Sequence, residues 1–145
     1  MNDWYGEVEK FGLRHERFQA SVRFTDGRIG ARANRGVQLS PEKLDALIWG
    51  LDHANPVVRR CCLEFLDQHP DKKALPSILR CLEDPVPRVR WHAVHALICD
   101  KCKSDFSYIN DDVVERVRIV AKSDASPKVR SQAIYGIGKF ENACT

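Results

Sequence analysis

Three short stretches of this 145-residue chain share one pattern: NPVVR at 55–59, VPRVR at 86–90 and SPKVR at 126–130. In each stretch a Pro precedes a Val-Arg pair, and small or apolar residues follow at fixed distances from the Arg. Because 3.6 residues make one helical turn, residues three, four and seven positions after the Arg share one face of an α-helix. These positions hold Cys62, Leu63 and Leu66 in the first stretch, Ala93, Val94 and Leu97 in the second, and Ala133, Ile134 and Ile137 in the third.

A second helical pattern lies upstream of each stretch, with apolar residues at helical spacing in 44–51, 75–82 and 113–120. Ser and Pro at 40–41 open the first of these as N-cap and first helical residue. The Pro before each Val-Arg pair ends the first helix and allows a tight turn into the second. The unit is therefore a helical hairpin, repeated after 31 and then 40 residues, with a polar loop at 101–112 in the longer interval.

These hairpins resemble HEAT repeats, of the short kind found in PBS-lyase-like proteins. That family carries an Asp six residues before an Arg that follows a Val, as do Asp84 with Arg90 and Asp124 with Arg130. In the first hairpin His53 occupies the Asp position. The resemblance implies an all-α fold, a right-handed α-α superhelix of stacked hairpins. It says little about activity, because function depends on the sites that a fold carries.

We expect one solenoid domain, with repeats at 40–70, 71–104 and 110–141 behind a degenerate N-terminal capping unit at 1–39. A stacked hairpin cannot bury its apolar face alone, so a terminal unit has to shield one side. The helical stripe that predicts this capping unit consists of Trp4, Val8, Phe11, Phe18 and Val22.

The capping unit is expected to be a helix, a turn at 25–27 and a second helix. The alternative is a β-hairpin, because residues 18–24 alternate imperfectly between apolar and polar and the Asp-Gly pair at 26–27 is a hairpin-turn signal. We favour the helical interpretation.

Composition excludes several classes of protein. With 23 basic and 20 acidic residues the net charge is +3, too small to predict nucleic-acid binding without a local patch. No apolar run approaches the roughly 20 residues that span a bilayer. The N-terminus also lacks the order of a signal peptide. We therefore expect a cytoplasmic protein that does not contact membranes and does not form disulfides among its six cysteines.

Arg59, Arg90 and Arg130 recur at one repeat position. We interpret them as a structural ladder, in which each planar guanidinium pairs with an Asp at the turn of its own or a neighbouring hairpin. Asp84 and Asp124 are the expected partners. The alternative is a basic track for phosphates that these arginines would form with Arg60, Arg88 and Lys128, which makes nucleic acid the less favoured partner.

The densest basic cluster is the best nucleic-acid candidate in the chain, although a solvated basic face is the favoured interpretation. It consists of Arg23, Arg28, Arg32 and Arg35.

A stripe of His92, His95, Cys99 and Cys102 carries side chains that zinc prefers. Ten residues of straight helix extend about 15 Å, so only a subset can share one ion: His95 with Cys99, or Cys99 with Cys102. A neighbouring side chain would have to complete the site, and Cys61 is one candidate. The favoured interpretation is that the cysteines fill small spaces and the histidines are surface residues, so no cofactor is expected.

The sequence contains no nucleophile elbow, phosphate-binding loop, dinucleotide glycine pattern or HExxH motif, so we do not expect an enzyme. In a solenoid the second helices line one continuous face, and Trp, Tyr and Arg are enriched at binding hot spots. We predict that a protein or peptide binds this face. The expected binding residues are Arg60, Glu64, Trp91, His92, His95, Gln132 and Tyr135.

Overall fold

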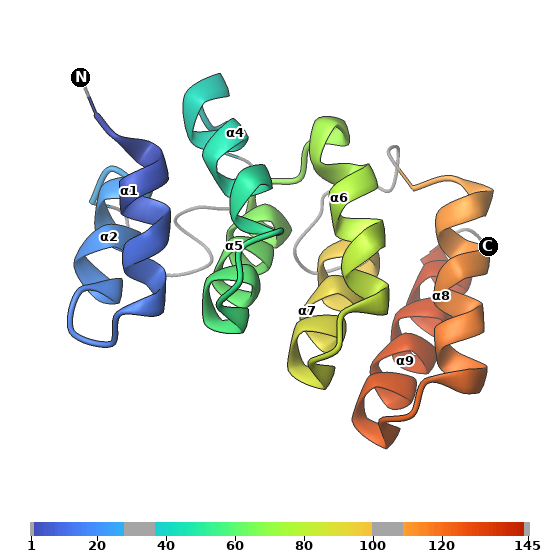
Figure 1. The fold of residues 1–145 in the computed structure, drawn as a ribbon. Helices are drawn as coiled ribbons and strands as arrows, with labels where there is room; N and C mark the ends of the chain where they lie inside the picture. The colour runs from blue at the N-terminus through green and yellow to red at the C-terminus, as the bar shows by residue number, and fades with distance from the viewer. Residues whose placement is uncertain (1, 28–36, 100–108, 144–145) are drawn as a thin grey trace.

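A computed structural model describes residues 2–27, 37–99 and 109–143, and the secondary structure of this part of the chain is helical. Successive helices form pairs that stand side by side from the N-terminal to the C-terminal end of the molecule (Figure 1). The pairs are α1 (Trp4–Glu9) with α2 (Arg17–Phe24), α4 (Pro41–Gly50) with α5 (Pro56–Gln68), α6 (Leu75–Arg80) with α7 (Pro87–Ile98), and α8 (Asp111–Ser123) with α9 (Pro127–Ala143). Short 3-10 segments cover Lys10–Gly12, Lys72–Ala74 and Cys81–Glu83. The predicted all-α solenoid is confirmed.

The helices stack in two rows. The first helix of each pair forms one row and the second helix lies in a row behind it (Figure 1). In the second row α5 packs against α7 and α7 packs against α9. Helix α7 therefore has a second-row neighbour on both sides, α5 and α9.

Three of the helices begin at the prolines that mark helix starts in the sequence. Ser40 Oγ accepts a hydrogen bond from the Lys43 backbone N–H, and Asn55 Oδ1 accepts one from Val57. Pro41, Pro56 and Pro87 each stand at the first position of a helix, where the missing N–H costs nothing because that group has no partner within the helix.

The predicted apolar face is buried in the first two repeats and only in part in the third. The residues three, four and seven after Arg59 and Arg90 have at most 1% exposure. After Arg130, Ala133 is fully buried, but Ile134 is 61% exposed. The prediction is wrong for Ile134, because this side of α9 has no further hairpin against it among the described residues.

The N-terminal unit differs from the expected single helix before the turn at 25–27. A 3-10 segment and a turn at 13–16 divide it into α1 and α2, which form a hairpin of their own. Phe18 is 61% exposed, so it does not share the buried stripe of Val8 and Phe11. Phe24 takes its place in the core instead.

An aromatic cluster explains why Phe24 rather than Phe18 is buried. The ring of Phe24 lies 5.0 Å from that of Trp4, 5.3 Å from Phe11 and 5.5 Å from Phe65 of α5. Burial of these large rings against the next hairpin decides which side of α2 faces inward. Residues 18–24 are helical, so the first strand of the alternative β-hairpin does not form. Residues 28–36 lie outside the described part, and the domain boundaries stay a prediction.

Candidate functional site

Two Arg–Asp pairs with the same geometry join neighbouring hairpins. Arg59 donates from Nε to Asp84 Oδ2 (2.7 Å) and from Nη2 to Asp84 Oδ1 (3.0 Å). Arg90 donates in the same way to Asp124, at 2.8 and 3.0 Å. The remaining nitrogen, Nη1, donates to a carbonyl at the turn of the same hairpin, His53 in one case and Asp84 in the other, each at 2.8 Å. Each arginine therefore ties its own turn to the aspartate of the next hairpin.

The aspartates also cap their own turns. Asp84 Oδ1 accepts from the Val86 N–H and Asp124 Oδ1 from the Ser126 N–H, both at 2.9 Å. Burial alone would raise the pKa of Asp124, but the hydrogen bonds from Arg90 and from the Ser126 backbone outweigh burial and lower it. The hydrogen bonds that Arg90 donates to Asp124 in turn raise the pKa of Arg90. The pair is therefore ionised at neutral pH.

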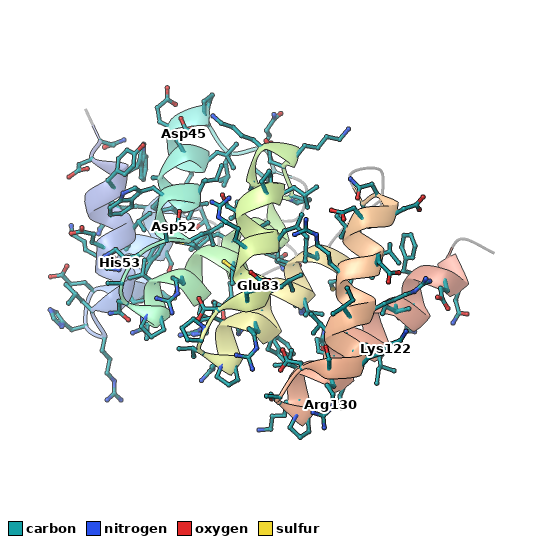
Figure 2. All side chains as sticks on the ribbon, turned by 45° about the vertical axis from the view of Figure 1, so that its right-hand side comes forward. Asp45, Asp52, His53, Glu83, Lys122 and Arg130 are labelled. Atoms are coloured by element: carbon teal, nitrogen blue, oxygen red, sulfur yellow. The ribbon has the colours of Figure 1, made fainter. Side chains whose placement is uncertain are left out.

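The two ends of this ladder lie at His53 and Arg130, which Figure 2 labels near opposite ends of the molecule. His53 Nδ1 accepts from the Asn55 N–H at 3.0 Å, so the imidazole caps its turn as the aspartates do. Arg130 Nη1 donates to the Asp124 carbonyl at 2.6 Å. In the described part of the chain no carboxylate reaches Arg130, because no hairpin follows it there.

This pairing takes Arg59 and Arg90 out of the alternative phosphate track. Arg59 and Arg90 are held by carboxylates inside the protein. Arg23 donates from Nε to Glu7 Oε2 at 2.6 Å. Arg23 belongs to the basic cluster near the N-terminus, and the other members of that cluster lie outside the described residues: Arg28, Arg32 and Arg35.

The structure brings together five of the seven predicted binding residues on α5 and α7. Arg60 Nη1 donates to Glu64 Oε1 at 2.9 Å, and His92 Nε2 lies 3.7 Å from the same oxygen. The Trp91 ring lies 4.9 Å from the His92 ring and 5.3 Å from the His95 ring. These contacts form a continuous polar and aromatic surface across two repeats.

The other two predicted residues lie on α9. Tyr135 is 50% exposed, and Lys139 Nζ stands 5.7 Å above its ring. Gln132 is half-buried. They share the second-helix row with Trp91, and Lys139, the cation that lies over the Tyr135 ring, is also on α9.

A groove of about 560 Å³ runs between the first turns of α7 and α9. Its size falls within the range of about 300–1,000 Å³ typical of ligand sites. The sequence predicts Trp91 and His92 on a binding surface, whereas it places Arg88 and Lys128 only in the alternative phosphate track. Each of these two basic residues directly follows the Pro that starts its helix. This shared repeat position is the feature of the sequence that could have placed them together. The groove is lined by Pro87, Arg88, Trp91, His92, Ser126, Lys128 and Val129.

The charge of the groove comes from Arg88, Lys128 and the two helix N-termini, whose backbone N–H groups carry partial positive charge. His92 adds none at neutral pH. Burial, followed by the nearby charge of Arg60, lowers the pKa of His92 to about 4. The groove therefore combines an aromatic wall with positive charge.

Part of the His/Cys stripe lies together with an aspartate that the sequence did not single out. Ligand atoms of Asp67, His95 and Cys99 lie within 4.8 Å of one another. Cys61, the suggested neighbour, does not belong to this cluster. Asp67 lies in the last turn of α5, near the end of α7 where Cys99 stands. Cys61 occupies the same repeat position as His92, which is earlier in its helix. Cys102 lies outside the described residues.

In the described residues, none of the helices combines the length and the apolar character that crossing a bilayer requires. Comparison with family models matches residues 44–99 to HEAT repeats. This segment runs from α4 to the residue after α7 and contains the Arg59–Asp84 pair. Neither the curated proteins nor the solved structures gave a match.

Proposed function

Because this chain carries HEAT repeats, we propose that it is a non-catalytic interaction module that binds a protein or peptide on the face of its second helices. HEAT repeats generally act as protein-interaction scaffolds and are typically non-catalytic. The observation that carries the proposal is the groove between α7 and α9, with Trp91 on its wall. We place this interaction in the cytoplasm, as the sequence predicts.

The groove suits a short peptide segment that carries an apolar side chain beside an acidic one. Trp91 is half-buried, so its ring is held in place while one part stays open to a partner. Such anchored aromatic residues dominate the energy of many interfaces. Arg88 and Lys128 are exposed at the same groove and favour a carboxylate over a basic side chain.

The Arg90–Asp124 pair connects the two walls of the groove. It joins the α7 hairpin to the α9 hairpin through two short hydrogen bonds. Because both walls of the groove are tied together in the free protein, little ordering is needed when a partner binds. A preformed surface of this kind binds more tightly than one that has to be ordered first.

The proposal is tested with an array of synthetic peptides, each with one Trp, Phe or Leu beside two or three acidic residues. Each peptide has a partner in which the acidic residues are replaced by Lys. We expect acidic peptides to bind in preference to basic ones. Trp91→Ala should weaken binding by about tenfold or more, the loss typical of a hot-spot residue. Reversing the charge at Arg88 and Lys128 should weaken binding further.

The matched control is Trp49→Ala. Trp49 is 40% exposed on α4, in the first-helix row, where it packs against Tyr5 and His53. Its loss removes the same type of side chain from the other row of helices and should leave peptide binding unchanged. Equal binding by folded Trp91→Ala and wild-type protein would contradict the proposal. Tight, steeply salt-dependent binding of a DNA duplex that displaces the peptide would instead assign the groove to nucleic acid.

A further inference from the structure

A second polar cluster lies at the other end of α7, away from the groove. It joins Asp67 in the last turn of α5 to His95 and Cys99 at the end of α7. Asp67 Oδ2 lies 3.5 Å from His95 Nε2. From this geometry we propose that Asp67, His95 and Cys99 bind a zinc ion that links the second helices of two neighbouring repeats.

The positions of the three residues converge for simple reasons. His95 and Cys99 stand four residues apart, so their side chains lie one above the other on the same side of α7. Cys99 is the C-cap residue of α7, with φ −76° and ψ 116°, so the backbone leaves the helix there. Asp67 comes from α5, which packs directly against α7.

The distances are close to those of a zinc site. Zinc bonds of about 2.0–2.3 Å in a tetrahedral arrangement place ligand atoms about 3.5 Å apart. The Asp67–His95 pair already has this separation, and the cluster as a whole lies within 4.8 Å. A small rotation of the Cys99 or His95 side chain is therefore enough to bring all three donors onto one ion.

The donor set selects the type of metal. One imidazole nitrogen, one thiolate and one carboxylate oxygen suit zinc and similar transition metals, whereas Mg²⁺ and Ca²⁺ take oxygen ligands. Binding requires the Cys99 thiol to lose its proton to solvent as the Zn–S bond forms. The zinc ion gains one anionic sulfur and one anionic oxygen ligand, which balance its charge of two.

Cys99 differs from the other described cysteines in its surroundings. Cys61, Cys62 and Cys81 are buried, whereas Cys99 is half-buried. Burial raises the pKa of all three buried thiols, to about 12 for Cys81. These thiols keep their protons and compete poorly for a metal. Asp67 is itself 6% exposed, so the carboxylate is held inside the protein next to His95.

The simpler explanation is a hydrogen-bonded Asp67–His95 pair that needs no metal. The two explanations differ in the role of Cys99. A hydrogen-bonded pair does not require the thiol, whereas a zinc site loses a ligand without it. Cys99→Ser is therefore the decisive variant.

The experiment titrates metal-stripped, full-length protein with Zn²⁺ by calorimetry and with Co²⁺ by absorption spectroscopy. We expect one ion per chain and a thiolate-to-cobalt charge-transfer band. Cys99→Ser should abolish that band and weaken Zn²⁺ binding at least tenfold. Asp67→Asn and His95→Gln should each weaken it by a similar factor. The matched controls are His15→Gln and Asp52→Asn, which change exposed residues outside the cluster and should leave binding unchanged.

A measurement on the unmodified chain keeps the test independent of variants that fold poorly. Zinc should protect one thiol from alkylation, and peptide mass mapping should identify that thiol as Cys99. The proposal is overturned if Zn²⁺ does not bind, if Cys99→Ser binds as tightly as wild type, or if zinc leaves alkylation of Cys99 unchanged.

Discussion

Helices α7 and α9 carry the same repeat pattern, but only α7 has a neighbouring second helix on both sides. Val94 of α7 is fully buried, as is Leu63 of α5 at the same position, whereas Ile134 of α9 is 61% exposed. Arg90 holds a carboxylate with two hydrogen bonds, whereas Arg130 donates to the Asp124 backbone carbonyl. Equivalent residues thus have different surroundings because the stacking partner, and not the pattern itself, supplies the contact.

This difference shows that the contribution of a residue to stability depends on whether another hairpin packs against its position. The position four residues after the arginine is buried in the repeats that another hairpin follows, and in those repeats the guanidinium also meets the aspartate of the following hairpin. In a solenoid, stability is approximately a sum of terms within repeats and between neighbours. Substitutions at equivalent positions in the middle and at the end should therefore separate the two kinds of term.

The largest difference is expected between Leu63→Ala and Ile134→Ala. Leu63 is fully buried between repeats, so its truncation leaves a cavity and should destabilise the protein by about 3 kcal/mol. Ile134 is mostly in water, so its truncation should change stability by about 0.5 kcal/mol or less. Urea unfolding followed by circular dichroism measures both. Equal losses would mean that Ile134 is covered in solution.

The next comparison is Arg90→Ala with Arg130→Ala. Loss of Arg90 leaves the buried Asp124 carboxylate without its cation, and should destabilise by about 2–4 kcal/mol. Loss of Arg130 removes a hydrogen bond to a carbonyl and should destabilise by about 1 kcal/mol or less. The same unfolding measurement applies. If the double variant Arg90→Ala/Asp124→Asn is no more stable than Arg90→Ala, the unpaired charge is not the cause of the loss.

The third comparison tests the sign of the effect and not its size, and uses two glycines of α9 that face opposite ways. A Cβ at Gly136 would meet Ile98 Cγ2 on α7, whereas one at Gly138 meets nothing within 4 Å. Gly136→Ala should destabilise by about 1–3 kcal/mol, because the packed Ile98 has to move. Gly138→Ala should stabilise by about 0.5–1 kcal/mol, because alanine favours a helix over glycine. Thermal unfolding of both variants checks the opposite signs, and two losses of equal size would mean that α9 is covered on both sides.

The fold was predictable from the sequence in the repeats and less so at the N-terminus. The Pro-capped starts of α5 and α7 appeared in the sequence because capping depends on neighbouring residues. The N-terminal hairpin was misplaced because its buried face depends on Phe65, a residue of another repeat. Periodicity within residues 4–24 could not show that Phe24 reaches this distant ring.

The candidate site was predicted in part for the same reason. Trp91 and His92 were identified from their place opposite the apolar face of one helix, which is a local property. The groove also needs Lys128 of the next hairpin. The zinc hypothesis named His95, Cys99 and Cys102, with Cys61 as a candidate neighbour, and among the described residues the side chain that lies with His95 and Cys99 is that of Asp67.

From its amino acids alone this chain determines where the helices start, which side of each is apolar and that the hairpins repeat, since these properties arise within one or two helical turns. Tertiary structure alone decides which apolar sides are covered. It also decides which carboxylate each guanidinium holds, because Arg59 meets Asp84 across 25 residues and Arg90 meets Asp124 across 34. Such contacts depend on how one hairpin packs on the next, a geometry that no local spacing encodes.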